Sequence, residues 1–266
     1  TSVNWTWAAG GASPAITYTV KVVDDSGNKY RFNDFGTSAV TLDLQEGGTY
    51  TFDASDSSVD SHPFVIGTAA NSSEYSTGVT YQLDGVSKTY SQYTSGFATA
   101  TTRKLIITVA ASAPALYYWC SNHSGMGGAI NTNSLFGSSN FGGAVQSIAT
   151  TNDTAGFSII TFTSDAAAGD TVIKHGLSKA PTFMIMKSRS NSGIWWVYHD
   201  SLTDDGYMHL ESTNANQDGS TNVWRNTAPT SSVFKTGLNS LNNTNGATMV
   251  GYCFAPIQGF SKFDSY

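Results

Sequence analysis

The chain has 266 residues and a net charge of −6, with 12% charged and 12% aromatic residues. Disordered chains have the opposite bias, and long helices need far more than the three glutamates found here, so both are excluded. Lys and Arg do not cluster and no apolar run approaches the roughly 18 residues that span a bilayer, so we expect neither nucleic-acid binding nor membrane insertion.

The first half of the chain is predicted to be β-rich. Residues 1–15 (TSVNWTWAAGGASPA) are small and polar apart from two tryptophans and are interpreted as a connecting segment. From Ile16 the sequence alternates between apolar and polar residues, with turns at DDSGN and at Gly47-Gly48. Such short alternating runs separated by turn residues predict an antiparallel sandwich or barrel. The expected strands are ITYTVKVVD, KYRFN, AVTLDLQ, TYTFDAS, HPFVIG, GVTYQLDG, RKLIITVA and ALYYWC.

The second half is predicted to form a separate β module. Residues 131–152 lose the alternation and fill with Asn, Ser and Gly, which is typical of a linker or a loose edge segment. About 115 residues lie on each side of this segment, a common domain size. The alternation then resumes in GFSIITFTS, DTVIKHG, PTFMIMKS, IWWVYHD, YMHLES, NVWRN, SSVFKTG and ATMVGYCFA. We therefore predict an all-β chain, divided into 1–15, 16–130, 131–152 and 153–266.

One group of residues has the chemistry of a metal site. Cys120, His123 and Met126 form a C-x2-H-x2-M run directly after an expected strand, and His62 opens another strand. A thiolate, two imidazoles and a thioether are the ligands that copper prefers, with the thioether as a weak axial ligand. Three ligands on one short loop fix their mutual geometry, and the fourth is supplied by a neighbouring strand. The alternative is a sandwich that keeps the loop for packing and binds no metal.

Residues 16–130 resemble the cupredoxins, the fold of plastocyanin and amicyanin. The resemblance rests on LQEGGTYTF, on SHPFVI around the first histidine, and on YYWCSNHSGMGG. It implies a cupredoxin-like antiparallel β-sandwich in which His62, Cys120 and His123 are equatorial copper ligands and Met126 is the axial ligand. Two departures are Pro63, where many relatives have a polar residue, and the stretch DASDSSVDS before the histidine.

Residues 153–266 are similar to a module of marine phage tail fibres and related virion proteins. The strings that carry the similarity are HGLSKAPTFMIMKSRS, IWWVYHDSL, NTAPTSSVFKTG and GYCFAPIQGFSKFDSY. Cupredoxin-like segments that end in CSNHSGMGG are familiar from the same kind of chain. The resemblance implies a second β-sandwich-like module and a place in a virion appendage, but no chemistry.

Catalytic motifs are not found, so we expect no enzyme and predict no catalytic residues. A nucleophile elbow, G-x-S-x-G, is missing, and His175, His199 and His209 lie in strand-like segments that favour structural roles. Asp53, Asp56 and Asp60 do not have the spacing of an EF-hand loop and are interpreted as a solvated acidic loop. Cys120 and Cys253 fall in different modules, so no disulfide framework is expected.

These observations leave two main hypotheses. The first is a structural and adhesive component of a phage virion, in contact with other virion proteins and a host receptor, and assembled as a homotrimer. The second is a secreted or periplasmic blue-copper electron carrier. A carbohydrate-binding module is a third, which has only the aromatic β-rich composition in its favour. Because the chain starts at Thr1 without a signal-peptide pattern, we expect a processed protein or a part of a longer one.

Overall fold

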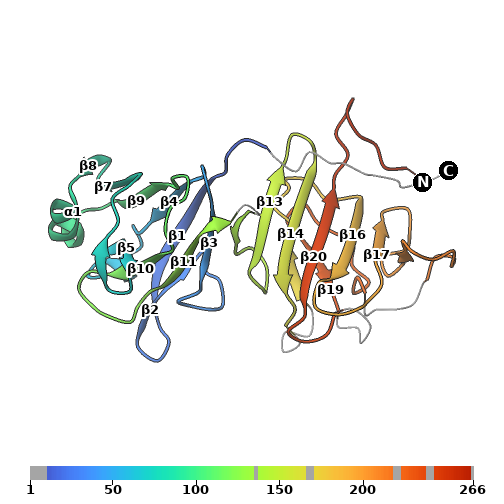
Figure 1. Cartoon of the computed structure of the whole chain (residues 1–266), viewed down its shortest axis with the longest axis horizontal. Helices are drawn as coiled ribbons and strands as arrows, with labels where there is room; N and C mark the ends of the chain where they lie inside the picture. Colours follow the sequence, from blue (N-terminus) through green and yellow to red (C-terminus); the bar gives the residue numbers. More distant parts are fainter. Residues whose placement is uncertain (1–10, 135–136, 166–170, 218–222, 238–242, 265–266) are drawn as a thin grey trace. The chain divides into compact units, whose positions relative to one another are not determined.

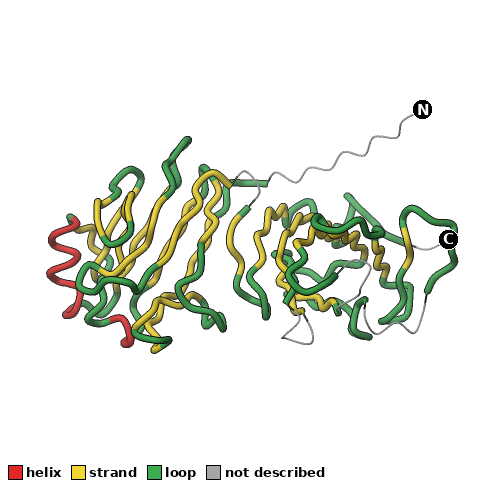
Figure 2. The backbone as a smooth tube through the Cα atoms, turned by 60° about the horizontal axis from the view of Figure 1, so that its bottom comes forward, coloured by secondary structure: helices red, strands yellow, loops and turns green. Residues whose placement is uncertain are grey.

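The computed structural model describes residues 11–134, 137–165, 171–217, 223–237 and 243–264. It divides the chain into two compact units, Ser13–Ser139 and a second unit that contains residues 140–266. Most of the predicted connecting segment 1–15 lies outside the described residues. The all-β prediction is confirmed, and strands dominate both units (Figure 2).

The first unit is built from two sheets. The six-stranded sheet has the order β2-β1-β4-β9-β7-β8 and the five-stranded sheet has the order β3-β11-β10-β5-β6. Their strands are β1 (Ala15–Asp24), β2 (Asn28–Phe32), β3 (Leu42–Gln45), β4 (Thr49–Asp53), β5 (Phe64–Ala69), β6 (Ser72–Glu74), β7 (Val79–Leu83), β8 (Val86–Lys88), β9 (Arg103–Thr108), β10 (Leu116–Cys120) and β11 (Gly128–Ser134).

Aromatic side chains fill the space between these two sheets. The rings of Phe52 on β4 and Phe64 on β5 stack with centroids 4.9 Å apart, and Phe32 on β2 meets Tyr118 on β10 edge-to-face at 5.1 Å. Each pair joins one sheet to the other, and all four side chains are buried. The first unit is therefore a β-sandwich with an aromatic core.

The sheets of the first unit are mixed, which differs from the antiparallel sandwich that we expected. Strand β1 pairs with β4 in parallel, and β11 pairs with β3 in parallel. Hairpin turns produce antiparallel neighbours, whereas both parallel pairs join strands that are far apart in sequence. The alternation of side chains is the same in either case.

Three short helical segments accompany the first sandwich. They are η1 (Ser57–Val59), α1 (Tyr90–Gly96) and η2 (Phe97–Thr99). Helix α1 begins with a capping box, in which the Thr89 hydroxyl accepts from the Gln92 backbone and the Gln92 side chain accepts from the Thr89 backbone.

The second unit is built on a seven-stranded sheet with a small sheet against one face, and the edge strand β12 of the large sheet spans the boundary between the units at Ser139. The order is β12-β13-β14-β20-β16-β17-β18, and Figure 1 shows the long central pair β14 and β20 side by side. The strands are β12 (Ser138–Asn140), β13 (Ser147–Asn152), β14 (Phe157–Thr163), β16 (Phe183–Ser188), β17 (Trp196–His199), β18 (Met208–His209) and β20 (Thr248–Phe254). The two-stranded sheet contains β15 (Thr171–Lys174) and β19 (Val233–Thr236).

The core of the second unit lies between these two sheets. Phe162 on β14 meets Phe234 on β19 at 6.4 Å, and Ile160, Ile173 and Met249 are fully buried around them. This packing makes the second unit β-sandwich-like.

Two segments differ from the sequence-based expectations. Residues 131–152, predicted as a linker or a loose edge segment, contain most of β11 and all of β12 and β13, because backbone pairing with neighbouring strands compensates for their small polar side chains. The segment NVWRN was predicted as a strand, but Arg225 and Asn226 have φ values of 59° and 46°, which a strand does not allow. Trp224 still enters the core.

Strand alternation places Trp196 and Tyr198 of the run IWWVYHD on one face and Trp195 and Val197 on the other. Trp196 and Tyr198 belong to the core cluster, whereas the ring of Trp195 lies 6.3 Å from Tyr252, beneath the Lys187 ammonium. The free cysteines Cys120 and Cys253 are both buried.

Candidate metal centre

His62 lies on the short loop that connects η1 to β5. Its backbone N–H donates to the Val59 carbonyl at 2.8 Å, and its side chain is only 8% exposed. The loop is anchored by the buried Arg103, which pairs with Asp60 at 2.6 Å and donates to the Ser55 carbonyl at 3.1 Å. Contacts within the protein alone therefore hold His62 in place.

Cys120 and His123 come from the end of β10 and the loop that follows. Cys120 is 2% exposed and pairs across the sheet with Phe64, two residues after His62. His123 is exposed. The Asn122 side chain donates to the Ser61 carbonyl at 3.0 Å, which ties the Cys120 loop to the His62 loop. Two loops separated by about 60 residues in the sequence thus meet at one point.

The three donor atoms form a small triangle. Nδ1 of His62 lies 3.0 Å from Nδ1 of His123, and the Cys120 Sγ lies 3.8 Å and 3.6 Å from these two nitrogens. Bonds of about 2.0–2.3 Å from a central ion place such donors about 3–4 Å from one another. The cluster could therefore bind a metal ion.

The electrostatics of the site favour an uncharged His62. Burial lowers the pKa of His62, and the neighbouring His123 lowers it further. A neutral imidazole is the form that ligates a metal, so less free energy is spent on removing a proton. Among the described residues, no carboxylate belongs to the cluster, so the thiol is its single anionic donor once deprotonated.

Met126, the fourth predicted ligand, is buried at 1% exposure in the same loop. Its carbonyl accepts from the backbone N–H of Tyr30 at 2.9 Å. The two glycines that follow it allow a very close approach to the sheet. A Cβ atom on Gly127 would meet the Tyr118 carbonyl oxygen at 1.7 Å, and one on Gly128 would meet the Ala39 carbonyl oxygen at 2.8 Å. The role of Met126 as an axial ligand stays a prediction.

Sequence reasoning missed two residues that contact the cluster, Asn28 and Tyr30. The Asn28 side-chain nitrogen lies 3.4 Å from Nε2 of His62, and the Tyr30 hydroxyl donates to the His62 carbonyl at 2.8 Å. Both lie on β2 at alternate positions. Their spacing indicates that they share a face, but nothing in the sequence indicates that this face meets His62.

The other histidines considered in the sequence have structural surroundings. His175 is fully buried, with Nε2 on the Thr230 carbonyl at 3.1 Å and Nδ1 accepting from the Leu177 N–H at 3.2 Å. His199 uses Nδ1 for its neighbours Asp200 and Ser201.

The acidic loop residues are engaged in turns and ion pairs. Asp53 accepts from the Ser55 N–H, Asp56 caps η1 by accepting from Ser58, and Asp60 pairs with Arg103. Each of these carboxylates thus has a structural role in a turn, a helix cap or an ion pair.

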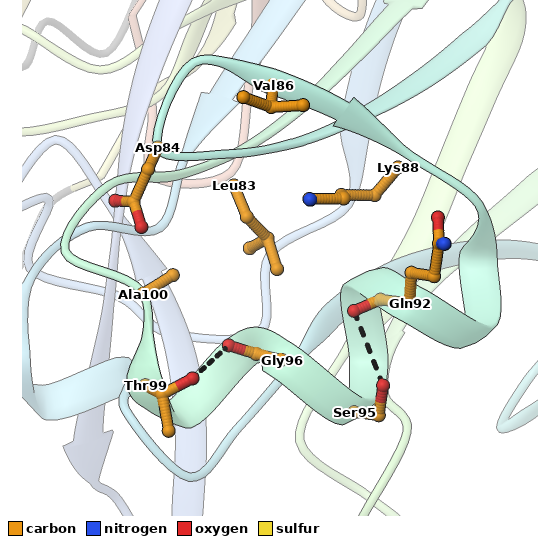
Figure 3. A pocket seen from close by; sticks show the side chains of 9 residues that line it. All are labelled: Leu83, Asp84, Val86, Lys88, Gln92, Ser95, Gly96, Thr99 and Ala100. Atoms are coloured by element: carbon orange, nitrogen blue, oxygen red, sulfur yellow. Dashed lines mark hydrogen bonds between the residues drawn. The ribbon is translucent and has the colours of Figure 1, made fainter.

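A shallow pocket of about 380 Å³ lies between the β7–β8 hairpin and the helical segment (Figure 3). Its polar groups bond within the protein: Ser95 donates to the Gln92 carbonyl, Thr99 donates to the Gly96 carbonyl, and Asp84 accepts from two backbone N–H groups. Asp84 is the single carboxylate among the lining residues, and backbone N–H groups already engage it, so the pocket offers no group of three metal donors.

Comparison with known proteins gives one family. A family model described as a domain of unknown function, DUF7483, matches residues 96–266, which is more than half of the chain. The chain belongs to the DUF7483 family. The match includes Cys120, His123, Met126 and the second unit, but begins after His62, so the family pattern does not coincide with the two structural units. No curated protein and no solved structure matches the chain. In the part of the chain that the structure describes, no helix is both long and apolar enough to cross a membrane.

Proposed function

We propose that the first unit is a cupredoxin-like module that binds one copper ion through His62, Cys120 and His123, with Met126 as the axial ligand. The observation that carries the proposal is the triangle of one sulfur and two Nδ1 atoms, with sides of 3.0, 3.6 and 3.8 Å. A thiolate with two imidazoles is a donor set suited to copper, and a thioether from the same loop adds a soft ligand.

The bound ion would link two parts of the sandwich. His62 precedes β5, whereas the other ligands lie at the end of β10 and on the loop after it, so an ion shared between them closes a loop between two residues 58 positions apart, His62 and Cys120. Metal binding of this kind contributes directly to the free energy of folding, because the unfolded chain has no such site. This stabilising role needs no electron partner and no catalytic step, and we assign the chain no enzymatic activity.

Loading the purified chain with Cu(II) tests the proposal. Wild-type protein is expected to bind one equivalent and to show an intense visible band from the copper–thiolate bond. The band should disappear in Cys120→Ser and persist in Cys253→Ser, the matched control, because Cys253 is buried in the other unit. Met126→Leu should retain the band and shift the reduction potential. A colourless wild-type protein that binds no copper, with Cys120 readily alkylated, would refute the proposal.

We further propose that the chain is a structural and adhesive part of a phage virion, in an extracellular appendage. What supports this is the similarity of residues 153–266 to tail-fibre modules, together with a sequence rich in Ser, Thr, Asn and Gly and only 12% charged. Its partners would be other virion proteins, a host receptor and two further copies of the chain. Antibodies against the second unit should label an appendage of the particle in electron micrographs, and sedimentation should give a trimer. Labelling confined to host cells, or a monomer at micromolar concentration, would count against it.

A blue-copper electron carrier is the second candidate. Its favouring observation is that His123 is exposed while His62 and Cys120 are buried, so one ligand edge faces solvent. Rapid electron exchange with a small redox reagent, lost in His123→Ala, would favour the carrier. A copper site that exchanges electrons slowly would favour the stabilising role.

A further inference from the structure

Strand β2 contacts the candidate metal centre from the opposite sheet. It is the edge strand of the six-stranded sheet, whereas His62 and Cys120 adjoin β5 and β10 of the five-stranded sheet. Asn28 and Tyr30 occupy alternate positions of β2 and therefore lie on one face. Contacts from these two residues reach two of the four proposed ligands, His62 and Met126.

Tyr30 bonds to both loops of the centre. Its hydroxyl donates to the His62 carbonyl at 2.8 Å, and its backbone N–H donates to the Met126 carbonyl at 2.9 Å. The side chain is fully buried. A phenol has a single hydrogen to donate, and the short distance assigns it to the His62 carbonyl.

Asn28 faces the ring of the same histidine. Nδ1 of His62 points toward Cys120 and His123, and Nε2 lies 3.4 Å from the Asn28 amide. An imidazole that ligates through Nδ1 carries its proton on Nε2. The Asn28 side chain has both an acceptor and donors, so after a half-turn of its amide the side-chain oxygen can accept a hydrogen bond from this Nε2–H group. It would then hold the ring in the ligating tautomer.

We infer that Tyr30 and Asn28 are positioning residues of the metal centre, with Tyr30 fixing the backbone of His62 and Met126, and Asn28 fixing the His62 ring. The inference rests on the proposed metal binding and extends it to residues that are not ligands. It makes the affinity for copper depend on β2, although β2 supplies no donor atom.

Tyr30→Phe compared with Tyr118→Phe separates positioning from general stability. The Tyr118 hydroxyl donates to the Val40 carbonyl at 2.7 Å and its side chain is 1% exposed, so both variants lose one buried hydroxyl from the same sandwich. Tyr30→Phe should weaken Cu(II) binding by about 10- to 100-fold and alter the copper–thiolate band. Tyr118→Phe should stay within about threefold of wild type.

The Asn28→Ala variant provides a second measurement that does not depend on core packing, because Asn28 is exposed. Its affinity for Cu(II) should fall by about 10-fold. Asn131→Ala is its control, since the Asn131 amide is also exposed and donates to Asp43 at 3.1 Å on another strand pair. Asn131→Ala should bind copper as the wild type does.

Two results would overturn the inference. If wild-type protein binds copper and Tyr30→Phe and Asn28→Ala bind it equally well, β2 does not position the ligands, while the proposed function stands. If Tyr30→Phe and Tyr118→Phe weaken binding to the same extent, the effect is general stability.

A wild-type protein that binds no copper would refute the proposed function. The positioning role of Tyr30 is then tested in metal-free protein through the accessibility of Cys120. In that case Tyr30→Phe should expose Cys120 to alkylation at least about 10-fold faster than Tyr118→Phe does, and the His62 ring resonances should shift. Equal rates in the two variants would overturn the inference there as well.

Discussion

The close approach of Gly127 to β10 predicts that Gly127→Ala disrupts the ligand loop. A Cβ atom there would lie 1.7 Å from the Tyr118 carbonyl oxygen and 2.6 Å from the carbonyl carbon. Both atoms are backbone, so no side-chain rotation relieves the clash, and the loop must move away from the strand.

The size of the effect follows from what that movement breaks. The hydrogen bond from Tyr30 to Met126 and the pairing of Gly128 with Tyr118 lie on either side of Gly127. Losing two backbone hydrogen bonds costs about 1 kcal/mol each, and overpacking adds at least about 1 kcal/mol. We therefore expect the first unit to lose about 3 kcal/mol of stability and the chain to lose copper binding.

Alkylation of the buried cysteines measures this loss in each unit separately. In metal-free protein, Cys120 should react roughly 100-fold faster in Gly127→Ala, since each 1.4 kcal/mol is a factor of ten. Cys253 reports on the second unit and should be unchanged.

Gly36→Ala is the control substitution, because a Cβ atom at Gly36 meets nothing within 4 Å and its φ is not positive. It should shift the stability by less than about 0.5 kcal/mol. If the rate of Cys120 alkylation in Gly127→Ala stays within about threefold of the wild-type rate, the loop does not lie against β10 as described.

Three further outcomes are expected. Burial lowers the pKa of His175 below its value in the unfolded chain, so the stabilisation should be complete above about pH 6.5 and fall, by up to about 1.4 kcal/mol per pH unit, as the pH drops toward the folded pKa. Urea titrations from about pH 7.5 to 5 should show a weaker pH dependence of stability in His175→Gln, and equal slopes in the two proteins would contradict this. Ile160→Ala should cost the second unit about 2–5 kcal/mol and speed alkylation of Cys253 alone, whereas a change at Cys120 would mean that the units are coupled. Asp60→Asn leaves the buried Arg103 without its ionic partner, so the free energy of unfolding of the first unit should fall by about 2 kcal/mol and the affinity for copper should weaken. Urea unfolding and Cu(II) titration measure the two effects, and unchanged values would show that the ion pair does not hold the His62 loop.

Side-chain alternation predicted the β character of the chain, because a half-buried strand leaves a period of two in the sequence. The same signal cannot predict strand order. Strand β1 beside β4 and β11 beside β3 are parallel neighbours that no turn residue encodes. Residues 131–152 carry no alternation, yet they form strands because their partners supply the hydrogen bonds.

The sequence likewise predicts one part of the candidate site, the proposed ligands, and leaves another part, their neighbours on β2, unpredicted. The thiol of Cys120 and the imidazole of His123 are visible as a spacing on one loop, and His62 is added as a ligand type from a neighbouring segment. The contacts of Asn28 and Tyr30 with His62 depend on how one sheet lies over the other, which is a property of tertiary packing alone.

The separation of His62 from Cys120 along the chain has a kinetic consequence. His62 and Cys120 are 58 positions apart, and β5 and β10 must pair before the two side chains meet. The entropy cost of closing the chain is therefore borne when β5 pairs with β10, and long-range pairing of this kind is slow. An ion present from the start of refolding should therefore leave the folding rate nearly unchanged and slow unfolding instead, so that copper would set the lifetime of the folded module rather than the speed of its formation.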